Sequence, residues 1–387
     1  MKKIGILTFH RSFNYGAFIQ CYSLTYRLKA DFPEAKIEVI DYCNEAVLKS
    51  YARSMNNIRR RLTHPFTKKK IQKRNDSIAR AQELLPLSSF RIVTDDYGRL
   101  FNEIKNLYDI IIVGSDAVWN WTIRGFPNAY FINSDICANR MSYAASSYGQ
   151  DYSSLSQFQS EFLREAFSCF SYIGVRDEPT RKLVLAVNPE LKPEHNCDPS
   201  LLLNLGLIDV DMDAILWKLK KCGINPNKPM IGVMGGDWLS KKIYSLFRRE
   251  YQIIALYDPS QWANTYLFDL SPFEWARIFS LFKMTFTHYF HGTLLSIMNN
   301  ILTFAVEADS DYSKRYDTKI LDALKRLELA KYHYFRSQIE KSGWDRLKDE
   351  AVSSQASSTI NFECHIERET RTYNNFRETL AKLLNFY

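Results

Sequence analysis

The sequence predicts an α/β protein built from two Rossmann-like domains that face a cleft. Each half of the chain alternates short apolar strands with helices, as parallel sheets with helical crossovers require. Small and polar residues follow several of these strands, at the edge where open α/β sheets bind ligands. The chain has 387 residues, 46% of them hydrophobic, and is therefore long enough to fill two cores.

The boundary between the two domains is predicted near residue 222. The first domain covers 1–222 and the second covers 223–369, with 222–229 as the linker. Residues 370–387 carry apolar side chains near helical spacing, which predicts a terminal helix packed against the rest of the protein.

The order of the predicted elements defines each domain. In the first domain, strands are expected at 3–8, 37–41, 108–113, 141–149 and 172–175, and helices at 17–30, 44–86 and 156–170. In the second domain, strands are expected at 230–234, 253–257, 282–286 and 301–306, and helices at 235–249, 271–279, 294–299 and 320–329. The strand at 108–113 is almost wholly apolar, as a strand buried on both faces of a parallel sheet should be.

Composition limits the classes of function. Seven cysteines are scattered singly without a Cys-x-x-Cys pair, which favours reduced thiols over a zinc site or a disulfide framework. The apolar run at the amino terminus is too short for a signal peptide, and no stretch reaches the length of a membrane span. The net charge of +8 favours anionic partners. We therefore expect a cytoplasmic protein, with peripheral contact at the inner face of the membrane left open.

The most basic stretch lies between Asn57 and Arg74. Its cations are Arg59, Arg60, Arg61, Lys68, Lys69, Lys70, Lys73 and Arg74, and it contains no acidic residue. Such a cluster can rest on an anionic membrane surface, which would suit an acceptor attached to a lipid. A solvated excursion is favoured instead, because Pro65 interrupts the run and no strong apolar face accompanies it. Binding of nucleic acid is disfavoured, since aromatic residues are not interleaved with the cations.

A loop between a strand and a helix in the second domain holds the first candidate site. Phe290-His291-Gly292-Thr293 follows the strand near 282–286. Gly292 would let a ligand approach the backbone closely, and the N–H groups from Gly292 to Leu294 at the helix start would hold an anion. The imidazole of His291 can exchange a proton or bind phosphate. A cap or a core hydrogen bond is the alternative role for His291.

Two loops of the first domain form candidate rims for a ligand. The first carries Asn14, Tyr15 and Gly16; it lacks the three glycines of a dinucleotide fingerprint, so NAD is disfavoured. Asn14 and Gly16 would otherwise shape the turn and cap the helix. The second loop offers Ser115, Asp116 and Asn120 to sugar hydroxyls and Trp119 or Trp121 to a sugar face. Burial is the commoner fate of tryptophan, and Asp116 also suits an N-cap.

Arg176 is the candidate cation of the first domain. It stands at the end of the strand predicted at 172–175, and a guanidinium binds phosphate or carboxylate through paired hydrogen bonds. The alternative is a salt bridge with Asp177, Glu178 or another carboxylate.

These motifs, taken in order, resemble the polysaccharide pyruvyl transferase family. The resemblance covers most of the chain. It rests on Gly5-Ile6-Leu7-Thr8 with Asn14-Tyr15-Gly16-Ala17, Val113-Gly114-Ser115-Asp116 with Trp119-Asn120, Ser142-Tyr143-Ala144-Ala145-Ser146, Val175-Arg176-Asp177-Glu178, Asp198-Pro199-Ser200-Leu201-Leu202, Ser271-Pro272-Phe273-Glu274, and Phe290-His291-Gly292-Thr293 followed by Ser296.

The resemblance implies a GT-B-like fold, as in two-domain glycosyltransferases, with the terminal helix packing back on the first domain. It implies transfer of a pyruvyl group from phosphoenolpyruvate to sugar hydroxyls, as a ketal on a cell-surface polysaccharide, such as a capsule or exopolysaccharide, or on its lipid-linked precursor. No cofactor is implied, no metal cluster is visible in the sequence, and the chemistry does not demand one.

The same resemblance assigns roles to the candidate residues. Arg176 and His291 match family positions that bind phosphoenolpyruvate, and His291 is the candidate general acid or the residue that stabilises the leaving phosphate. The donor site would comprise Arg176, His288, Tyr289, Phe290, His291, Gly292 and Thr293, and the acceptor site Asn14, Tyr15, Gly16, Ser115, Asp116, Trp119 and Asn120.

One residue departs from the family pattern. Tyr289 stands where many members carry arginine, so either His288, Lys314, Arg315 or Lys319 supplies the charge, or this branch of the family uses a different donor. The alternatives to a pyruvyl transferase are a GT-B glycosyltransferase that uses a nucleotide sugar and a non-catalytic saccharide-binding protein.

Overall fold

The computed structural model describes residues 1–49, 67–132, 136, 138–356 and 361–385. The chain divides into two compact units. Unit 1 comprises residues 1–57, 79–203 and 369–387, and unit 2 comprises 58–78 and 204–368. Arg59, Arg60 and Arg61 of the basic stretch lie outside the described residues.

Unit 1 is built on a parallel sheet of order β3-β2-β1-β4-β5-β6-β7 within the described residues. Its strands are β1 (Lys3–Leu7), β2 (Lys36–Cys43), β3 (Leu87–Val93), β4 (Ile110–Val113), β5 (Asn139–Ala145), β6 (Phe170–Val175) and β7 (Glu194–His195). Its helices are α1 (Tyr15–Asp31), α5 (Tyr97–Ile104), α6 (Trp121–Arg124), α7 (Gln157–Ser168), α8 (Glu178–Val187) and α17 (Tyr373–Leu384). The central β4 is buried throughout, as its apolar sequence predicted.

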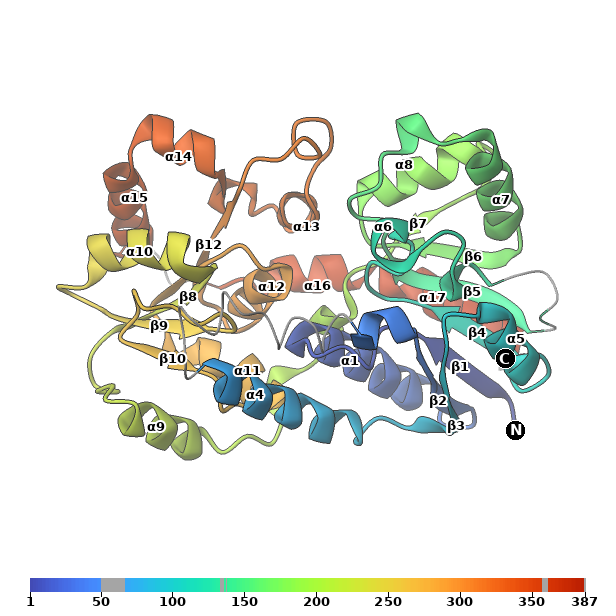
Figure 1. The fold of residues 1–387 in the computed structure, drawn as a ribbon, viewed down its shortest axis with the longest axis horizontal. Helices are drawn as coiled ribbons and strands as arrows, with labels where there is room; N and C mark the ends of the chain where they lie inside the picture. Colours follow the sequence, from blue (N-terminus) through green and yellow to red (C-terminus); the bar gives the residue numbers. More distant parts are fainter. Residues whose placement is uncertain (50–66, 133–135, 137, 357–360, 386–387) are drawn as a thin grey trace. The chain divides into compact units, whose positions relative to one another are not determined.

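Unit 2 is built on a second parallel sheet, of order β10-β9-β8-β11-β12-β13. Figure 1 labels β8, β9, β10 and β12 of this sheet. Its strands are β8 (Met230–Met234), β9 (Gln252–Leu256), β10 (Thr265–Leu267), β11 (Met284–Thr287), β12 (Leu302–Glu307) and β13 (His333–Phe335). Its helices are α9 (Met212–Lys221), α10 (Gly236–Phe247), α11 (Pro272–Ile278), α12 (Phe290–Met298), α13 (Lys319–Arg326), α14 (Arg336–Ser342) and α15 (Trp344–Ala356); α16 (Glu363–Thr370) leads out of the unit. The prediction of two parallel-sheet α/β domains is confirmed.

Local sequence explains why the helices begin where they do. Ser271 accepts the N–H of Glu274, whose side chain accepts the N–H of Ser271, so that a capping box with Pro272 in the first turn starts α11. Asn14 caps α1 in a similar way by accepting the N–H groups of Gly16 and Ala17. Helix α1 therefore begins at Tyr15, two residues before the predicted start.

The structural division differs from the predicted boundary at residue 222. Residues 204–222 group with unit 2. The physical reason is that α9 packs on α11, where Lys218 Nζ lies 2.8 Å from Glu274 Oε1.

The terminal helix α17 belongs to unit 1. The ring of Phe376 packs against those of Tyr143 and Tyr172, with centroid distances of 4.7 and 5.5 Å.

Helix α4 (Thr67–Gln82) follows β2 in the sequence, yet its first part groups with unit 2. Among the described residues, no helix combines the length and the apolar character needed to cross a bilayer.

Candidate functional site

The carboxyl edge of the unit 2 sheet carries the loop between β11 and α12. Helix α12 begins at Phe290 with Tyr289 as its N-cap, whereas the sequence predicted its start at Leu294. The N–H groups that have no helical carbonyl to bond are therefore those at Phe290, His291 and Gly292. The N–H of Thr293 already donates to the carbonyl of Tyr289, at 3.0 Å. The expected anion-binding end of the helix thus lies two residues earlier than predicted.

Gly292 has a packing role rather than the expected ligand-facing one. A Cβ at this position would lie 2.7 Å from Thr287 Oγ1 and 2.8 Å from Met234 Sδ, both closer than real contacts allow. The residue is buried. The glycine therefore lets α12 pack closely on β8 and β11.

His288 and Tyr289 stand in an aromatic cluster at the same edge. The ring of His288 is parallel to that of Trp238 within 4°. Burial lowers the pKa of His288, although the charges of Asp258 and Glu307 act in the opposite direction. His288 is therefore a neutral hydrogen-bonding group near pH 7.

Tyr289 is tied to Asp258 at the end of β9. Its hydroxyl donates to the Asp258 carboxylate. Burial, and then the negative charge of Asp258, raise the pKa of the phenol. Tyr289 is therefore protonated at neutral pH and carries no positive charge.

The cations expected to compensate for Tyr289 differ in position. Lys314 pairs with Asp311 on the surface at 2.8 Å, and Arg315 lies over the ring of Tyr316. The Nζ of Lys319 lies 5.7 Å from the centroid of the Phe290 ring. Of these three, Lys319 is the one placed against a residue of the α12 N-terminus.

In unit 1, Arg176 is buried and bound to carboxylates. Its Nη1 donates to Asp198 Oδ2 at 3.1 Å, and its Nη2 lies 3.9 Å from Asp116 Oδ1. The side chains of Arg176 and Asp198 are each 2% exposed. The salt bridge that sequence reasoning left open is therefore formed with Asp198, while Asp116 is partly exposed.

Most candidate acceptor residues make structural hydrogen bonds. The Oδ1 of Asn14 caps α1, where Tyr15 and Gly16 are buried in the first turn. Ser115 Oγ donates to Gln20 Oε1 at 2.9 Å. Asn120 donates to the carbonyl of Tyr148 and accepts from Gln150. The helix cap is the alternative role predicted for Asn14. Ser115 and Asn120 are buried.

Trp119 and Asp116 have different surroundings in the same loop. Trp119 is 0% exposed, and its Nε1 donates to the carbonyl of Tyr130 at 3.1 Å. It therefore packs in the core and offers no face to a sugar. Asp116 adopts a φ of 89°, a region that non-glycine residues rarely occupy, and is half-buried. Asp116 and Asn14 are the candidate acceptor residues that retain exposure.

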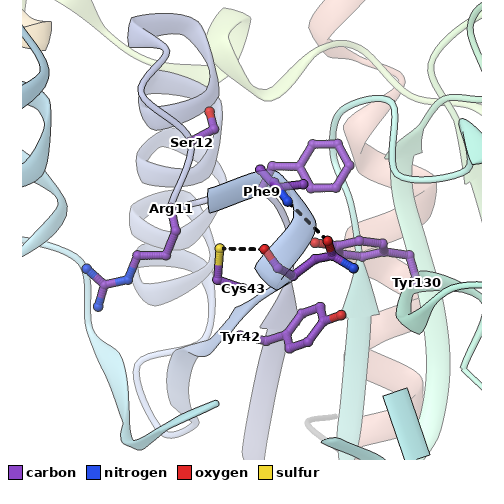
Figure 2. Close-up of a pocket in the computed structure, with 8 residues that line it drawn as sticks. Phe9, Arg11, Ser12, Tyr42, Cys43 and Tyr130 are labelled. Atoms are coloured by element: carbon purple, nitrogen blue, oxygen red, sulfur yellow. Dashed lines mark hydrogen bonds between the residues drawn. The ribbon is translucent and has the colours of Figure 1, made fainter. Parts of the chain in front are cut away.

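A hollow in unit 1 lies beside the ends of β1 and β2. It is lined by Phe9, Arg11, Ser12, Tyr42, Cys43, Asn44, Val47 and Tyr130. Figure 2 shows the guanidinium of Arg11 directed away from the rings of Phe9, Tyr42 and Tyr130. The cavity measures about 20 Å³, which is room for one water molecule and too small for a sugar ring. The hollow therefore does not qualify as a saccharide site.

The buried pair of His10 and Asp41 lies next to this hollow. His10 Nε2 is 3.0 Å from Asp41 Oδ1, and Arg11 also binds this carboxylate. Burial lowers the pKa of His10 despite the hydrogen bond to Asp41. Burial would raise the pKa of Asp41, but the hydrogen bonds from His10 and Arg11 hold it well below its usual range. The folded protein therefore holds a neutral imidazole against a carboxylate.

The two histidines with lowered pKa predict a loss of stability in mild acid. Between pH 7 and pH 5 the unfolded chain takes up protons that His10 and His288 refuse in the folded protein, so stability falls as pH falls. Each histidine contributes a slope of at most about 1.4 kcal/mol per pH unit. Asp41 adds little in this window, because the stability it contributes is lost as pH falls from its ordinary pKa toward the lower pKa of the folded protein. Urea unfolding at pH 7 and pH 5 gives the free energy of unfolding of the wild type and of His288→Gln. An equal change with pH in both proteins would contradict the contribution assigned to His288.

Sequence reasoning missed three residues at the unit 2 edge. Asp258 and Trp238 follow β9 and β8, and short polar stretches after strands were the available signal. Arg74 belongs to the basic stretch that was interpreted as solvated. Its Nη1 donates to the carbonyl of Tyr257 at 3.0 Å. Nothing in the sequence indicated that α4 would lie against unit 2.

The chain matches the sequence model of the polysaccharide pyruvyl transferase family over residues 14–310, more than half of its length. No curated protein sequence matches it.

The fold is similar to that of solved UDP-GlcNAc 2-epimerases. One, from Methanocaldococcus jannaschii, has a TM-score of 0.57 at 9% identity, with 100% of each chain covered. Another, from Neisseria meningitidis and bound to UDP-GlcNAc, has a TM-score of 0.57 at 9% identity, with 99% of this chain and 100% of the other covered. At such identity the likeness shows the fold alone, and it confirms the GT-B-like class. Because the family model matches most of its length, the chain belongs to the polysaccharide pyruvyl transferase family.

Proposed function

We propose that the protein transfers a pyruvyl group from phosphoenolpyruvate to two hydroxyls of a sugar, forming a cyclic ketal and releasing phosphate. The observation that carries this proposal is the N-terminus of α12, which places His291 in the first turn of the helix, at the carboxyl edge of the unit 2 sheet. Membership of the family supports the reaction class. A phosphorylated donor suits this position, because a helix N-terminus favours anions.

The reaction balances with two hydroxyls and no other reactant. The methylene carbon of phosphoenolpyruvate accepts a proton, and one sugar oxygen bonds to the neighbouring carbon. A second sugar oxygen then bonds to the same carbon as its bond to the phosphate oxygen breaks. The two hydroxyl protons end on the new methyl group and on the departing phosphate. The protein therefore has to move protons and to stabilise negative charge on phosphate.

His291 is assigned the proton transfer or the stabilisation of the leaving phosphate. It is the second residue of α12 and is partly exposed. Its ring lies edge-on to Phe290, with centroids 5.2 Å apart. The N–H groups of the first turn hold the phosphate in this proposal, and Thr293 lies one turn behind, with its hydroxyl donating to the carbonyl of Tyr289.

Unit 1 is assigned to the acceptor. Asp116 is its strongest candidate, since a partly exposed carboxylate accepts hydrogen bonds from sugar hydroxyls. Arg176 lies behind it, and in this proposal its positive charge holds Asp116 and Asp198 in place. A lipid-linked acceptor and contact of the basic stretch with an anionic membrane remain predictions.

Phosphate release tests the proposal directly. The purified protein is mixed with phosphoenolpyruvate and a panel of nitrophenyl sugars and lipid-linked saccharides, and free phosphate is measured. We expect release only when an acceptor with two suitably placed hydroxyls is present, together with a product heavier by the pyruvyl group. Release of a nucleotide from a nucleotide sugar instead would favour the glycosyltransferase alternative. Binding of saccharide without turnover would favour the non-catalytic one.

A further inference from the structure

Helix α4 places two cations against aromatic rings of unit 2. The Nζ of Lys70 lies 5.2 Å from the ring centroid of Phe268, and the guanidinium carbon of Arg74 lies 4.6 Å from that of Tyr257. Residues 58–78 group with unit 2, so these contacts lie within that unit. Lys70 and Arg74 are one helical turn apart and therefore share a face of α4.

The turn that Arg74 contacts has an unusual backbone. Tyr257 adopts a φ of 67°, and the N–H of Asp258 donates to the carbonyl of Leu256 at 2.8 Å. This is a γ-turn of the rare positive-φ type, which costs about 1–3 kcal/mol and persists only when surrounding contacts hold it. Arg74 Nη1 and the Tyr266 hydroxyl each donate to the Tyr257 carbonyl at 3.0 Å.

The guanidinium of Arg74 has hydrogen-bonding capacity beyond these contacts. A guanidinium carries five N–H donors. Its hydrogen bonds to Oδ1 of the adjacent Asn75 are long, at 3.3 and 3.4 Å. Among the residues that the structure describes, no carboxylate lies within 4.0 Å of Arg74. Asp258, the acidic group of the neighbouring turn, is bound by the Tyr289 hydroxyl.

We propose that Arg74, held over Tyr257 by α4, binds the carboxylate of the donor at the carboxyl edge of unit 2. This inference rests on the proposed function and names a residue of the donor site. The ring of Tyr257 lies 5.0 Å from that of Tyr289, the N-cap of α12. Arg74 and the N-cap residue Tyr289 therefore both pack against the ring of Tyr257.

The carboxylate is assigned to Arg74 because the two anionic groups of the donor differ in shape. A planar guanidinium matches a planar carboxylate through two parallel hydrogen bonds. The N–H groups at the start of α12 suit the tetrahedral phosphate. A site that divides the two groups in this way also selects the donor, because a phosphate ester without a carboxylate leaves Arg74 unmatched.

Two small molecules distinguish the proposed carboxylate contact at Arg74 from the proposed phosphate contact at the start of α12. Phosphoglycolate carries both a phosphate and a carboxylate, whereas methyl phosphate carries the phosphate alone. Dissociation constants for both are measured by calorimetry with the wild type, Arg74→Gln, Arg74→Lys and Lys73→Gln. Lys73 is the matched control, since it is an exposed cation of the same helix beside Arg74.

We expect Arg74→Gln to raise the dissociation constant of phosphoglycolate about 10-fold or more and to change that of methyl phosphate by less than about 2-fold. A tenfold change corresponds to about 1.4 kcal/mol, a usual value for one charge-assisted hydrogen bond. Arg74→Lys should be intermediate, and Lys73→Gln should match the wild type. The assignment would be overturned if Arg74→Gln lowered the affinity for both probes equally, or for neither. It would also be overturned if the wild type did not bind phosphoglycolate. If Arg74→Gln does not fold, Arg74→Lys alone decides between these outcomes.

The proposed function is judged separately. It fails if wild-type protein releases no phosphate from phosphoenolpyruvate across the acceptor panel. In the phosphate-release assay, Arg74→Gln should raise the KM for phosphoenolpyruvate and change kcat less. Loss of a purely structural contact would not change KM selectively.

Discussion

Replacing His291 by alanine is expected to lower phosphate release from phosphoenolpyruvate by about 10²–10⁴-fold, the usual contribution of one acid or base group. His291 is the titratable residue in the first turn of α12. Its side chain is partly exposed and lies outside the unit 2 core cluster, so the thermal unfolding temperature should stay within about 2 °C. The rate at saturating donor and the unfolding temperature are measured on the same preparation.

His365→Ala is the matched control for this experiment. His365 lies on α16, contacts the ring of Phe362 and belongs to the same unit. It should keep the full rate. His291→Gln separates proton transfer from hydrogen bonding, because an amide donates a hydrogen bond but does not titrate. An unchanged rate in His291→Ala would remove this residue from the mechanism.

Asp198→Asn should destabilise unit 1 by about 3–5 kcal/mol, the usual cost of leaving one partner of a buried ion pair without its counter-charge. Asp198 and Arg176 lie 3.1 Å apart, and each side chain is 2% exposed, so water does not screen the pair. Asparagine keeps the hydrogen bond that Asp198 accepts from the Ser200 N–H, so the change removes charge and little else. Urea unfolding measures the loss, and hydrogen exchange of the β6 amides locates it in unit 1.

Glu178→Gln provides the comparison for this charge removal. Glu178 pairs with Arg181 at 2.7 Å, but both side chains are about one-third exposed. A pair of this kind contributes at most about 1 kcal/mol. Replacing Arg176 by methionine and Asp198 by leucine together should recover most of the loss. A loss below 1 kcal/mol for Asp198→Asn would mean that Asp116, 3.9 Å from Arg176, compensates for the missing charge.

The long apolar strands could be predicted from the sequence, and the short edge strands could not. The buried run of β4 has no polar residue, so its place inside a parallel sheet follows from composition. Strand β13 has three residues, too few to show any period, and pairs in parallel with β12. Strand β3 alternates buried and exposed residues, yet it follows a helical basic stretch and was not recognised.

The candidate site shows a similar division. Position was predictable for His291, because the carboxyl end of a parallel strand is where such a loop must lie. Hydrogen-bond partners could not be predicted. Arg176, for example, pairs with Asp198, which lies in a different loop. Arg74 was beyond prediction, since its partner Tyr257 is remote in the sequence and only tertiary packing brings them together.

The exchange of segments between the two units bears on how the protein folds during synthesis. Helix α4 leaves the ribosome well before the unit 2 sheet on which Lys70 and Arg74 pack. Helix α17, whose Phe376 covers Tyr143 and Tyr172, leaves it last. Neither unit is formed from an uninterrupted stretch of nascent chain, so the usual order in which an amino-terminal domain folds first does not apply. Each unit therefore waits for a segment from the other half of the chain, and fragments cut between residues 203 and 204 would each lack a segment of their own unit.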